Sequence, residues 1–451
     1  MRRAFKMTIV WLCVKAAVGE SDSGTGFAAS FPQGVASGDP LHDAIILWTR
    51  APPTHVDHAG SVTVHWFVSL QKSRSKARNS SDSVQGFFET NSSFDWTVKV
   101  EPTGLSHSED YYYHFVVYGG GLAQSALGHF RLPPPAETTL QRLRYAAFSC
   151  SNWGFGYFNA YRVAAEEDLD FWLHLGDWFY EYGDDHYPSK QEAVRHGLDP
   201  PYEIIQLDDY RRRHRLYRSD PALQHLSAAS PLIAVWDDHE IANNPWVHGA
   251  EDHNPGEGSW ETRKKVAIQA YHEYMPTRSW DVQHGGYLGA LFYRNFTFGN
   301  LASLLMLESR LLNRTDPNEI PNVFHTAQEI VGATAPSSWG AEGETASKMQ
   351  RLKRTLDEYR GRSNKTMLGD AQLQWIERVT NHDAKHTTWQ LYGQQTVMQD
   401  MYAADLEAAA SAPGTPVSWS QLLRNLTEDV PHATYAGAGT EPYQSGLLNK
   451  V

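Results

Sequence analysis

Short runs of β-branched and aromatic residues, separated by turn-forming residues, fill the first third of the chain. Runs of this length and composition predict strands. We expect these strands at residues 44–50, 62–68, 96–100 and 111–118. Short strands at this spacing favour a small β-sandwich over residues 31–132, and the prolines at 133–135 then predict a stiff linker.

From residue 143 the pattern changes, because apolar runs now alternate with longer segments of helical character. Strands are predicted at residues 144–150, 171–175, 232–236, 301–307 and 388–392. Helices are predicted at residues 160–167, 208–217 and 260–274. Alternation of strands and helices is typical of an α/β layered domain, which we expect to occupy residues 143–451.

The N-terminus has the order of a secretory signal peptide, with a basic start, a mostly apolar stretch at residues 7–18 and small residues near its end. We therefore expect residues 1–20 to be a signal peptide. An uncleaved anchor is the alternative, because Lys15 interrupts the apolar stretch. No later segment reaches the length of a transmembrane helix.

Six Asn-X-Ser/Thr sequences accompany this N-terminus, and together they predict a secreted, N-glycosylated protein. They begin at Asn79, Asn91, Asn295, Asn313, Asn364 and Asn425.

Composition and charge argue against some classes of function for this chain, and nucleic-acid binding is the first of these. The 451 residues are 41% hydrophobic and 20% charged, a globular composition in a chain long enough for two or three domains. The net charge of −13 argues against a nucleic-acid-binding surface, although it also serves solubility alone. If the substrate is an anion, the site itself must supply positive charge through metal ions or clustered arginines.

Cys150 ends the predicted strand at residues 144–150, where α/β folds place their ligands. The only other cysteine, Cys13, lies in the expected signal peptide, so the mature chain would hold one thiol and no intramolecular disulfide. A lone cysteine is often a buried hydrophobe or a leftover thiol. Acidic residues after the next strands favour a metal ligand or a nucleophile here.

Two further predicted strands end in acidic residues. Asp177 follows Gly176, which lets the backbone turn tightly, although Gly-Asp pairs also occur in ordinary turns. Residues 237–240 read Asp-Asp-His-Glu. Such a cluster repels itself unless a cation, a substrate, a solvated loop or a helix start offsets its charge. Asn243 and Asn244 follow, and their amide oxygens suit hard cations.

The potential metal ligands are of two kinds. A thiolate from Cys150 and a phenolate from Tyr180 suit a softer or redox-capable transition metal, whereas carboxylate and amide oxygens suit calcium. Zinc is disfavoured because the sequence has no Cys-X-X-Cys and no His-Glu-X-X-His spacing. The serine-hydrolase elbow, the Walker loop and the dinucleotide-binding glycine motif are missing as well, so those enzyme classes lack support.

Taken together, these segments resemble the PhoD-like alkaline phosphatases, a branch of the calcineurin-type metallophosphoesterases. The resemblance is carried by residues 31–40, 47–50, 148–152, 173–183, 236–240, 243–244, 368–375 and 393–395. It implies an α/β fold, with a two-sheet αββα metallophosphatase domain preceded by a small N-terminal β-sandwich. It also implies a secreted, metal-dependent phosphoric ester hydrolase whose partners are small phosphate esters.

The same resemblance implies the metal ligands. Cys150 and Tyr180 would ligate a ferric ion, and Asp177 would bridge iron and calcium. Asn243, or its neighbour Asn244, would ligate calcium. A thiolate bound to iron is a poor nucleophile, so no covalent phosphoenzyme on Cys150 is expected.

The residues that meet the substrate also follow from the resemblance. Asp238 and His239 would line the site and contact phosphate, and Arg263 in the predicted helix at residues 260–274 would add a further phosphate contact. A metal-activated oxygen would attack phosphorus in line, with charge stabilisation lowering the barrier.

Two features depart from the family pattern. Family members carry a Gly-Asp-X-His segment near their C-terminus, and this chain has none after Met398, so we expect a form truncated there and weak hydrolysis at best. Residues 308–310 read Glu-Ser-Arg where the family usually has Asp-Thr-Arg. A catalytically inactive phosphatase-like glycoprotein is therefore one alternative, and a phosphodiesterase is another.

Overall fold

A computed structural model describes residues 31–53, 60–72, 83–107, 109–118, 122–278, 292–316, 354 and 366–396. The predicted signal peptide and the sequons at Asn79, Asn364 and Asn425 lie outside the described residues. Among the helices within these ranges, none is both long enough and apolar enough to cross a membrane.

A six-stranded sheet lies at the centre of the molecule. In spatial order its strands are β5 (Thr97–Val100), β2 (Ile46–Arg50), β1 (Val35–Gly38), β11 (Leu232–Ala234), β10 (Phe171–His174) and β9 (Tyr145–Phe148). The pairs β9–β10 and β10–β11 are parallel, so these three strands end at the same edge of the sheet. β1 joins β11 in parallel at Gly38 and Leu232, which carries the sheet across the predicted domain boundary.

A three-stranded sheet packs face to face on β9, β10 and β11. Its strands are β12 (Arg294–Phe298), β13 (Ala302–Met306) and β14 (Trp389–Gly393). Alternate residues of β10 explain the packing, because Phe171 and Leu173 enter the core between the sheets while Trp172 points to the helices. Phe171 stacks on Phe298 across this core with ring centroids 4.6 Å apart.

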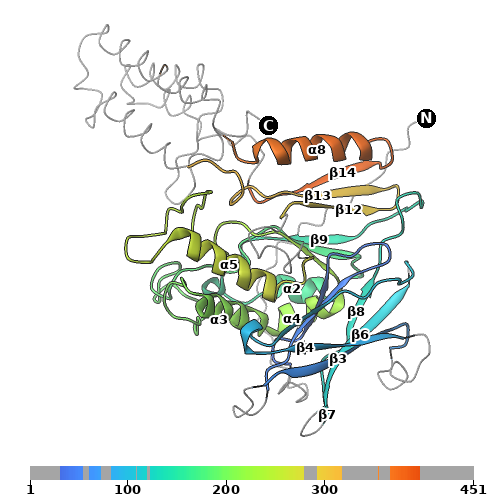
Figure 1. Ribbon diagram of the computed structural model, residues 1–451, viewed down its shortest axis with the longest axis horizontal. Helices are drawn as coiled ribbons and strands as arrows, with labels where there is room; N and C mark the ends of the chain where they lie inside the picture. The colour runs from blue at the N-terminus through green and yellow to red at the C-terminus, as the bar shows by residue number, and fades with distance from the viewer. Residues whose placement is uncertain are drawn as a thin grey trace, which may run out of the picture.

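Helices cover both outer faces of the paired sheets. One face carries α2 (Asn159–Ala164), α3 (Leu207–Arg218), α4 (Pro221–Ala229) and α5 (Trp260–Tyr274). The other carries α8 (Gly369–Asp383), whose apolar residues pack on Leu305 and Leu307. Figure 1 shows α8, the three-stranded sheet, β9 and the other helices in this order. The predicted αββα architecture is therefore confirmed.

The remaining N-terminal strands form a five-stranded sheet. They are β4 (Val84–Thr90), β3 (Val62–Ser69), β6 (Asp110–Tyr118), β7 (Leu122–Gln124) and β8 (Gly128–Arg131). Apolar residues of β3 and β6 pack against β1 and β2 in a core that includes Leu47, Val64 and Phe115. The two layers make a small β-sandwich, and one of them continues into the central sheet.

Candidate metal centre

Three loops at the carboxyl edge of the central sheet hold the predicted ligands. Cys150 follows β9, Asp177 follows β10 and Asp238 follows β11. Backbone hydrogen bonds join the first two loops, from Cys150 N to Gly176 O at 3.1 Å and from Ser151 N to Asp177 O at 2.8 Å. Cys150 and Asp177 both have left-handed backbone, with φ of 59° and 54°. Such local strain persists only where surrounding contacts fix it.

Gly176 brings the second and third loops together. Its φ is +102°, and a Cβ at this position would lie 2.3 Å from Cβ of Asp237. Any other residue would therefore push the loop after β10 away from the loop after β11. The tight turn predicted from the Gly-Asp pair is confirmed. Glycine is required there for the positive φ and also for the close approach of the loops after β10 and β11.

Glu240 also joins the loops after β10 and β11, through hydrogen bonds to their backbone. Its Oε2 accepts hydrogen bonds from the backbone N–H of Asp177 at 3.1 Å and of Asp237 at 2.9 Å, and its Oε1 accepts one from Trp178 N at 2.6 Å. The residue is 1% exposed, and burial raises the pKa of its carboxyl to about 8. Glu240 thus fixes the spacing between the loop that carries Asp177 and the loop that carries Asp237 and Asp238.

Asp177, Asp238 and His239 form a compact cluster, with ligand atoms that all lie within 4.8 Å of one another. Oδ2 of Asp177 accepts a hydrogen bond from the hydroxyl of Tyr180 at 3.1 Å. Oδ1 of Asp177 is buried and has no protein partner. A buried carboxylate oxygen without a partner is costly in an apoprotein, and a bound cation removes that cost.

His239 is oriented by a neighbouring acid. Its Nδ1–H donates to Oε2 of Glu181 at 2.7 Å, and the other carboxylate oxygen of Glu181 accepts from the backbone N–H of Asn243. Glu181 is fully buried. Because Nδ1 of His239 is bound to Glu181, the ring nitrogen Nε2 of His239 is the atom that remains for a ligand. Burial alone would lower the pKa of His239, but the Glu181 and Asp238 carboxylates raise it well above its usual value.

Arg310 supplies positive charge at the floor of the cluster. It donates from Nε to Oδ1 of Asp237, and its Nη2 lies 3.4 Å from Oδ1 of Asp238. Glu308 holds the arginine loop by accepting from the backbone N–H of Arg310 at 2.9 Å and of Leu311 at 2.7 Å. The Glu-Ser-Arg segment therefore delivers a buried arginine to the acidic cluster.

Neighbouring charges shift the pKa values of Asp177 and Asp238 in opposite directions. Burial and the neighbouring Asp238 carboxylate raise the pKa of Asp177 well above its usual value. Burial would also raise the pKa of Asp238, but the Arg310 guanidinium lowers it below the usual range. Although Cys150 is exposed, partial desolvation and the Asp177 carboxylate raise the pKa of its thiol to about 12. A metal bound here would have to displace protons from Cys150 and Tyr180.

Both predicted asparagines lie beside the cluster. The backbone N–H of Asn244 donates to Oδ2 of Asp238 at 3.1 Å, and its side-chain Nδ2 donates to Oε2 of Glu251 at 2.7 Å. Asn243 is tied to Glu181 through its backbone N–H. The amide nitrogens of both side chains are directed to Glu251, and for Asn243 this leaves the carbonyl oxygen as the atom that suits a hard cation.

Arg263 does not join this group. All five of its N–H donors bind protein atoms, namely the Tyr210 hydroxyl, the Asp252 carbonyl, the Glu257 carboxylate, the Glu203 carboxylate and the Ile204 carbonyl. Arg263 is 1% exposed. Our expectation of a phosphate contact from Arg263 is corrected by this arrangement, because the guanidinium has no donor left for a phosphate.

Sequence reasoning missed three residues of the centre, which are Glu181, Glu240 and Arg310. Glu181 and Glu240 stand inside the acidic segments after β10 and β11, so their positions already carried a signal. Arg310 stands in the Glu-Ser-Arg segment that was compared with the family pattern, but nothing in the sequence placed it beside the cluster, because only the packing of the three-stranded sheet brings its loop near.

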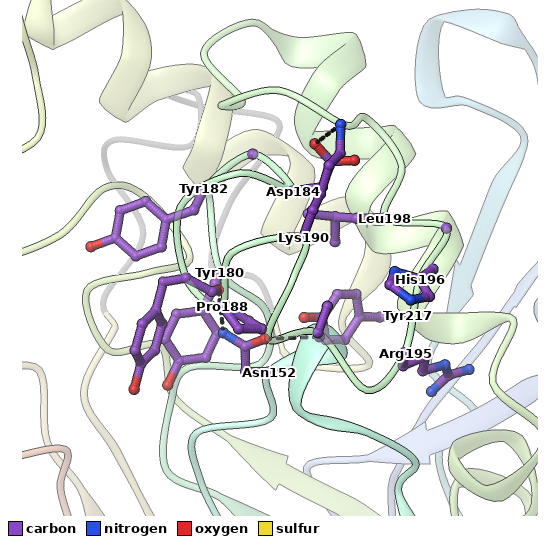
Figure 2. Close-up of a pocket in the computed structure, with 15 residues that line it drawn as sticks. Asn152, Tyr180, Tyr182, Asp184, Pro188, Lys190, Arg195, His196, Leu198 and Tyr217 are labelled. Carbon is purple, nitrogen blue, oxygen red and sulfur yellow. Dashed lines mark hydrogen bonds and ion pairs between the residues drawn. The ribbon is translucent and has the colours of Figure 1, made fainter.

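A cavity of about 340 Å³ adjoins the centre and shares Tyr180 with it (Figure 2). Its lining includes Tyr180, Tyr182, Tyr187 and Tyr217, together with Lys190, Arg195 and His196. The cavity therefore lies beside the candidate metal centre, along the loops that follow β9 and β10.

Comparison with known proteins places the chain in a family. Residues 145–434 match the PhoD-like phosphatase family, and residues 18–134 match the N-terminal domain of PhoD-like phosphatases. Over 370 residues the chain is 33% identical to alkaline phosphatase D of Bacillus subtilis (strain 168), covering 81% of this chain and 55% of that protein. A solved structure described as that of PhoD matches with a TM-score of 0.65 and 28% identity, covering 91% of this chain and 70% of that chain. The chain thus spans about half the length of the Bacillus relative.

Proposed function

Because the chain belongs to the PhoD-like phosphatase family, we propose that it is a metal-dependent hydrolase of phosphoric esters. The observation that carries this proposal is the cluster of Asp177, Asp238 and His239, with Oδ1 of Asp177 buried and unpartnered. A cation makes such a cluster favourable, and cations bind the anionic oxygens of phosphate esters.

The donor set fits two kinds of cation, and we assign ferric iron and calcium to it. Cys150 and Tyr180 would hold iron, since a thiolate and a phenolate suit a redox-capable transition metal. Asp177 lies beside both and would bridge the two ions, while Asn243 or Asn244 would offer an amide oxygen to calcium. Bound cations supply positive charge to the phosphate oxygens and activate water for attack on phosphorus.

The chain's own groups would orient the ester and move one proton. Glu181 fixes the ring of His239, so Nε2 would face the phosphate and donate a hydrogen bond to one of its oxygens. When the ester bond breaks, the leaving oxygen needs a proton, and an N–H at Nε2 could supply it. Arg310 would keep Asp238 ionised and in place beside the phosphate.

We test the function with protein purified from a secreting host without chelator. We expect near-stoichiometric iron and calcium, together with hydrolysis of nitrophenyl phosphate that chelation abolishes and the two metals restore. Parallel assays with bis-nitrophenyl phosphate decide between a monoesterase and a diesterase. Protein that binds neither metal and cleaves neither ester would support the inactive phosphatase-like glycoprotein instead.

The variant Cys150→Ser tests the ligand assignment separately. A mostly protonated hydroxyl replaces a soft thiolate, so iron content should fall by about tenfold or more while the protein stays folded. Asp168→Asn is the matched control, because it removes a 55% exposed carboxylate just before β10, at the opposite edge of the sheet. Equal iron content in both variants would show that Cys150 is an ordinary thiol.

We also propose that the protein is secreted and N-glycosylated, as the N-terminal pattern and the sequons suggest. Asn295 is exposed on β12 and would accept a glycan. Asn313 is a poor acceptor, because its amide nitrogen donates to the Leu368 carbonyl at 3.1 Å. Enzymatic deglycosylation followed by mass spectrometry should convert Asn295 to Asp and leave Asn313 unchanged. A glycan on Asn313 and none on Asn295 would contradict this placement.

A further inference from the structure

The cavity beside the metal centre can hold part of a substrate that is itself bound at the cluster. It shares Tyr180 with the centre, and the Tyr180 hydroxyl lies 3.1 Å from Oδ2 of Asp177. Its other walls come from Asn152 and from Gly154 in η2 (Trp153–Phe155), from the loop after β10 and from residues 190–198 (Figure 2). An ester whose phosphate occupies the cluster would therefore extend its organic group along this cavity.

The cations that line the cavity are already paired with protein carboxylates. Nζ of Lys190 lies 3.0 Å from Oδ1 of Asp184, and Nη1 of Arg195 lies 2.8 Å from Oδ2 of Asp220. The Arg195 guanidinium also lies over the Trp153 ring, 3.2 Å from its centroid. Because these charges are compensated, the cavity is poorly suited to a second anionic group and suits an uncharged one.

Aromatic rings form a continuous path from the cluster to the surface. The Tyr180 ring lies 4.1 Å from His239 and 6.0 Å from Tyr187, between centroids. Tyr187 in turn lies 5.0 Å from Phe155 in an edge-to-face arrangement. Tyr187 lines the cavity and is 50% exposed, so its ring has free surface for a ligand ring. Phe155 is 52% exposed and supports the Tyr187 ring from outside the cavity lining.

Close packing holds these rings in position. A Cβ on Gly154 would lie 2.5 Å from Cδ of Pro188, so the turn after Cys150 touches the loop that carries Tyr187. Asn152 joins the same segments, with Nδ2 donating to the Tyr187 carbonyl at 3.1 Å and Oδ1 accepting from Gly154 N at 2.9 Å. The aromatic surface is therefore formed before a ligand arrives, which reduces the entropy cost of binding.

We propose that this cavity binds a planar aromatic ring in the leaving group of the substrate. The chain would then prefer aryl-bearing phosphate esters, nucleotides included, over aliphatic esters of the same leaving-group acidity. This inference rests on the proposed function, since the ring reaches the cavity only when its phosphate is held at the cluster.

The test compares 2-phenylethyl phosphate with n-butyl phosphate, whose leaving alcohols have similar acidity and differ in the ring. The metal-loaded protein should prefer the phenylethyl ester in kcat/KM by about tenfold. Tyr187→Ala should lower this preference by about fivefold, mostly through KM, and Phe155→Ala should lower it less. Adenosine 5′-monophosphate shows whether the cavity accepts a nucleobase as well as a simple aryl group. If it does, kcat/KM for this nucleotide should fall in Tyr187→Ala.

Two exposed aromatic residues outside the cavity serve as matched controls. Tyr202 is 50% exposed and Phe87 is 67% exposed, and neither lines the cavity. Tyr202→Ala and Phe87→Ala should keep the wild-type preference. The proposal is overturned if Tyr187→Ala also keeps it while the esters are hydrolysed.

A second measurement distinguishes failure of this proposal from failure of the proposed phosphatase function. If metal-loaded protein cleaves no ester, calorimetric binding of 2-phenylethylphosphonate and butylphosphonate replaces the rate measurement. Preferential binding of the phenylethyl compound that Tyr187→Ala reduces would still support the cavity assignment. Equal affinities for the two phosphonates would reject it.

Discussion

Two buried aspartates, Asp95 and Asp177, differ in how the chain compensates their charge. Each has left-handed backbone, with φ of 48° and 54°, and each is 5% exposed. Asp95 follows η1 (Ser92–Phe94) at the junction of the N-terminal strands and the helices, whereas Asp177 follows β10 in the candidate metal centre. Burial and backbone geometry are therefore matched, and only the neighbours differ.

Asp95 is surrounded by donors. Oδ1 lies 2.7 Å from Nη2 of Arg50, and Oδ2 accepts hydrogen bonds from Arg215 and from the Tyr274 hydroxyl. Burial alone would raise the pKa of Asp95, but the arginines lower it below its usual value. This carboxylate stabilises the fold by joining β2 to α3 and α5.

Asp177 is surrounded by other acids. Burial together with Asp238, Asp237 and Glu240 raises its pKa, and one of its oxygens has no protein partner. The contrast teaches that burial does not distinguish a structural carboxylate from a binding one. Compensation does, because a buried carboxylate without a compensating partner stays ionised only when a ligand such as a cation offsets its charge.

The largest expected effect is on activity, and it should be confined to the centre. Asp177→Asn removes charge from the proposed bridge between two cations, so kcat/KM for nitrophenyl phosphate should fall by roughly 10²–10³-fold. Asp95→Asn, measured on the folded fraction at low temperature, should change it by less than about threefold. Near-normal turnover by Asp177→Asn would show that this residue only caps a turn.

The two variants should affect stability in the opposite order, with the larger loss in Asp95→Asn. Asp95→Asn leaves Arg50 and Arg215 buried without their partner, so the free energy of unfolding should fall by about 3 kcal/mol. In metal-free protein, Asp177→Asn should leave that free energy unchanged or raise it, because it removes an uncompensated buried charge. Urea unfolding of both chelated variants measures this, and equal losses from the two would contradict the contrast.

The pH dependence of stability separates the two regions further. The pKa of Asp95 is lowered in the folded chain relative to an ordinary value of 3.8, so its contribution is complete above about pH 4. As the pH falls through the lower folded pKa, the carboxylate is protonated and the contribution disappears. The stability difference between the wild type and Asp95→Asn should therefore be constant from pH 7 to pH 5 and shrink below pH 4. A constant difference down to pH 3 would contradict the assignment.

A smaller effect is expected from the residue that spaces the loops. Glu240→Gln replaces one acceptor oxygen with a donor, so one of its three backbone hydrogen bonds must be lost. Metal affinity should fall by about 10-fold to 100-fold, the range typical of groups that orient ligands. Calorimetric metal titration measures this change, and Glu192→Gln, an exposed acid outside the centre, is the control. An effect of Glu240→Gln on stability alone would restrict its role to folding.

The smallest effect on activity should come from Arg263. Because its donors are all bound to protein, Arg263→Lys should lower thermal stability and leave kcat/KM within about twofold of the wild type. Arg310→Lys, its counterpart in the centre, should lower kcat/KM by about tenfold, since a lysine cannot reach Asp237 and Asp238 together. Equal effects of the two variants on KM would restore the phosphate contact expected of Arg263 from the sequence.

The sequence predicted what depends on local pattern. The strands at β9, β10 and β11, and the placement of Cys150, Asp177 and Asp238 after them, follow from apolar runs that end at small or acidic residues. Parallel strands end at one edge, so residues far apart in the chain were expected to meet. The ligand roles themselves stay predictions.

What the sequence could not predict depends on contacts between distant segments. The pairing of β1 with β11 joins residues almost two hundred positions apart. The role of Arg310 depends on a sheet whose strands β12 and β14 are short, and β12 was not predicted at all. Arg263 was misjudged because a charged residue on a helix gives no sign that five acceptors surround it.

Metal-dependent stability of the wild type and of Asp177→Asn tests the central claim most directly. Thermal unfolding is recorded for both proteins after chelation and again after iron and calcium are restored. We expect the metals to raise the Tm of the wild type by several degrees and that of Asp177→Asn by little, since binding to the folded state stabilises it. Equal shifts in the two proteins, or no shift in the wild type, would show that the acidic cluster is not a metal centre.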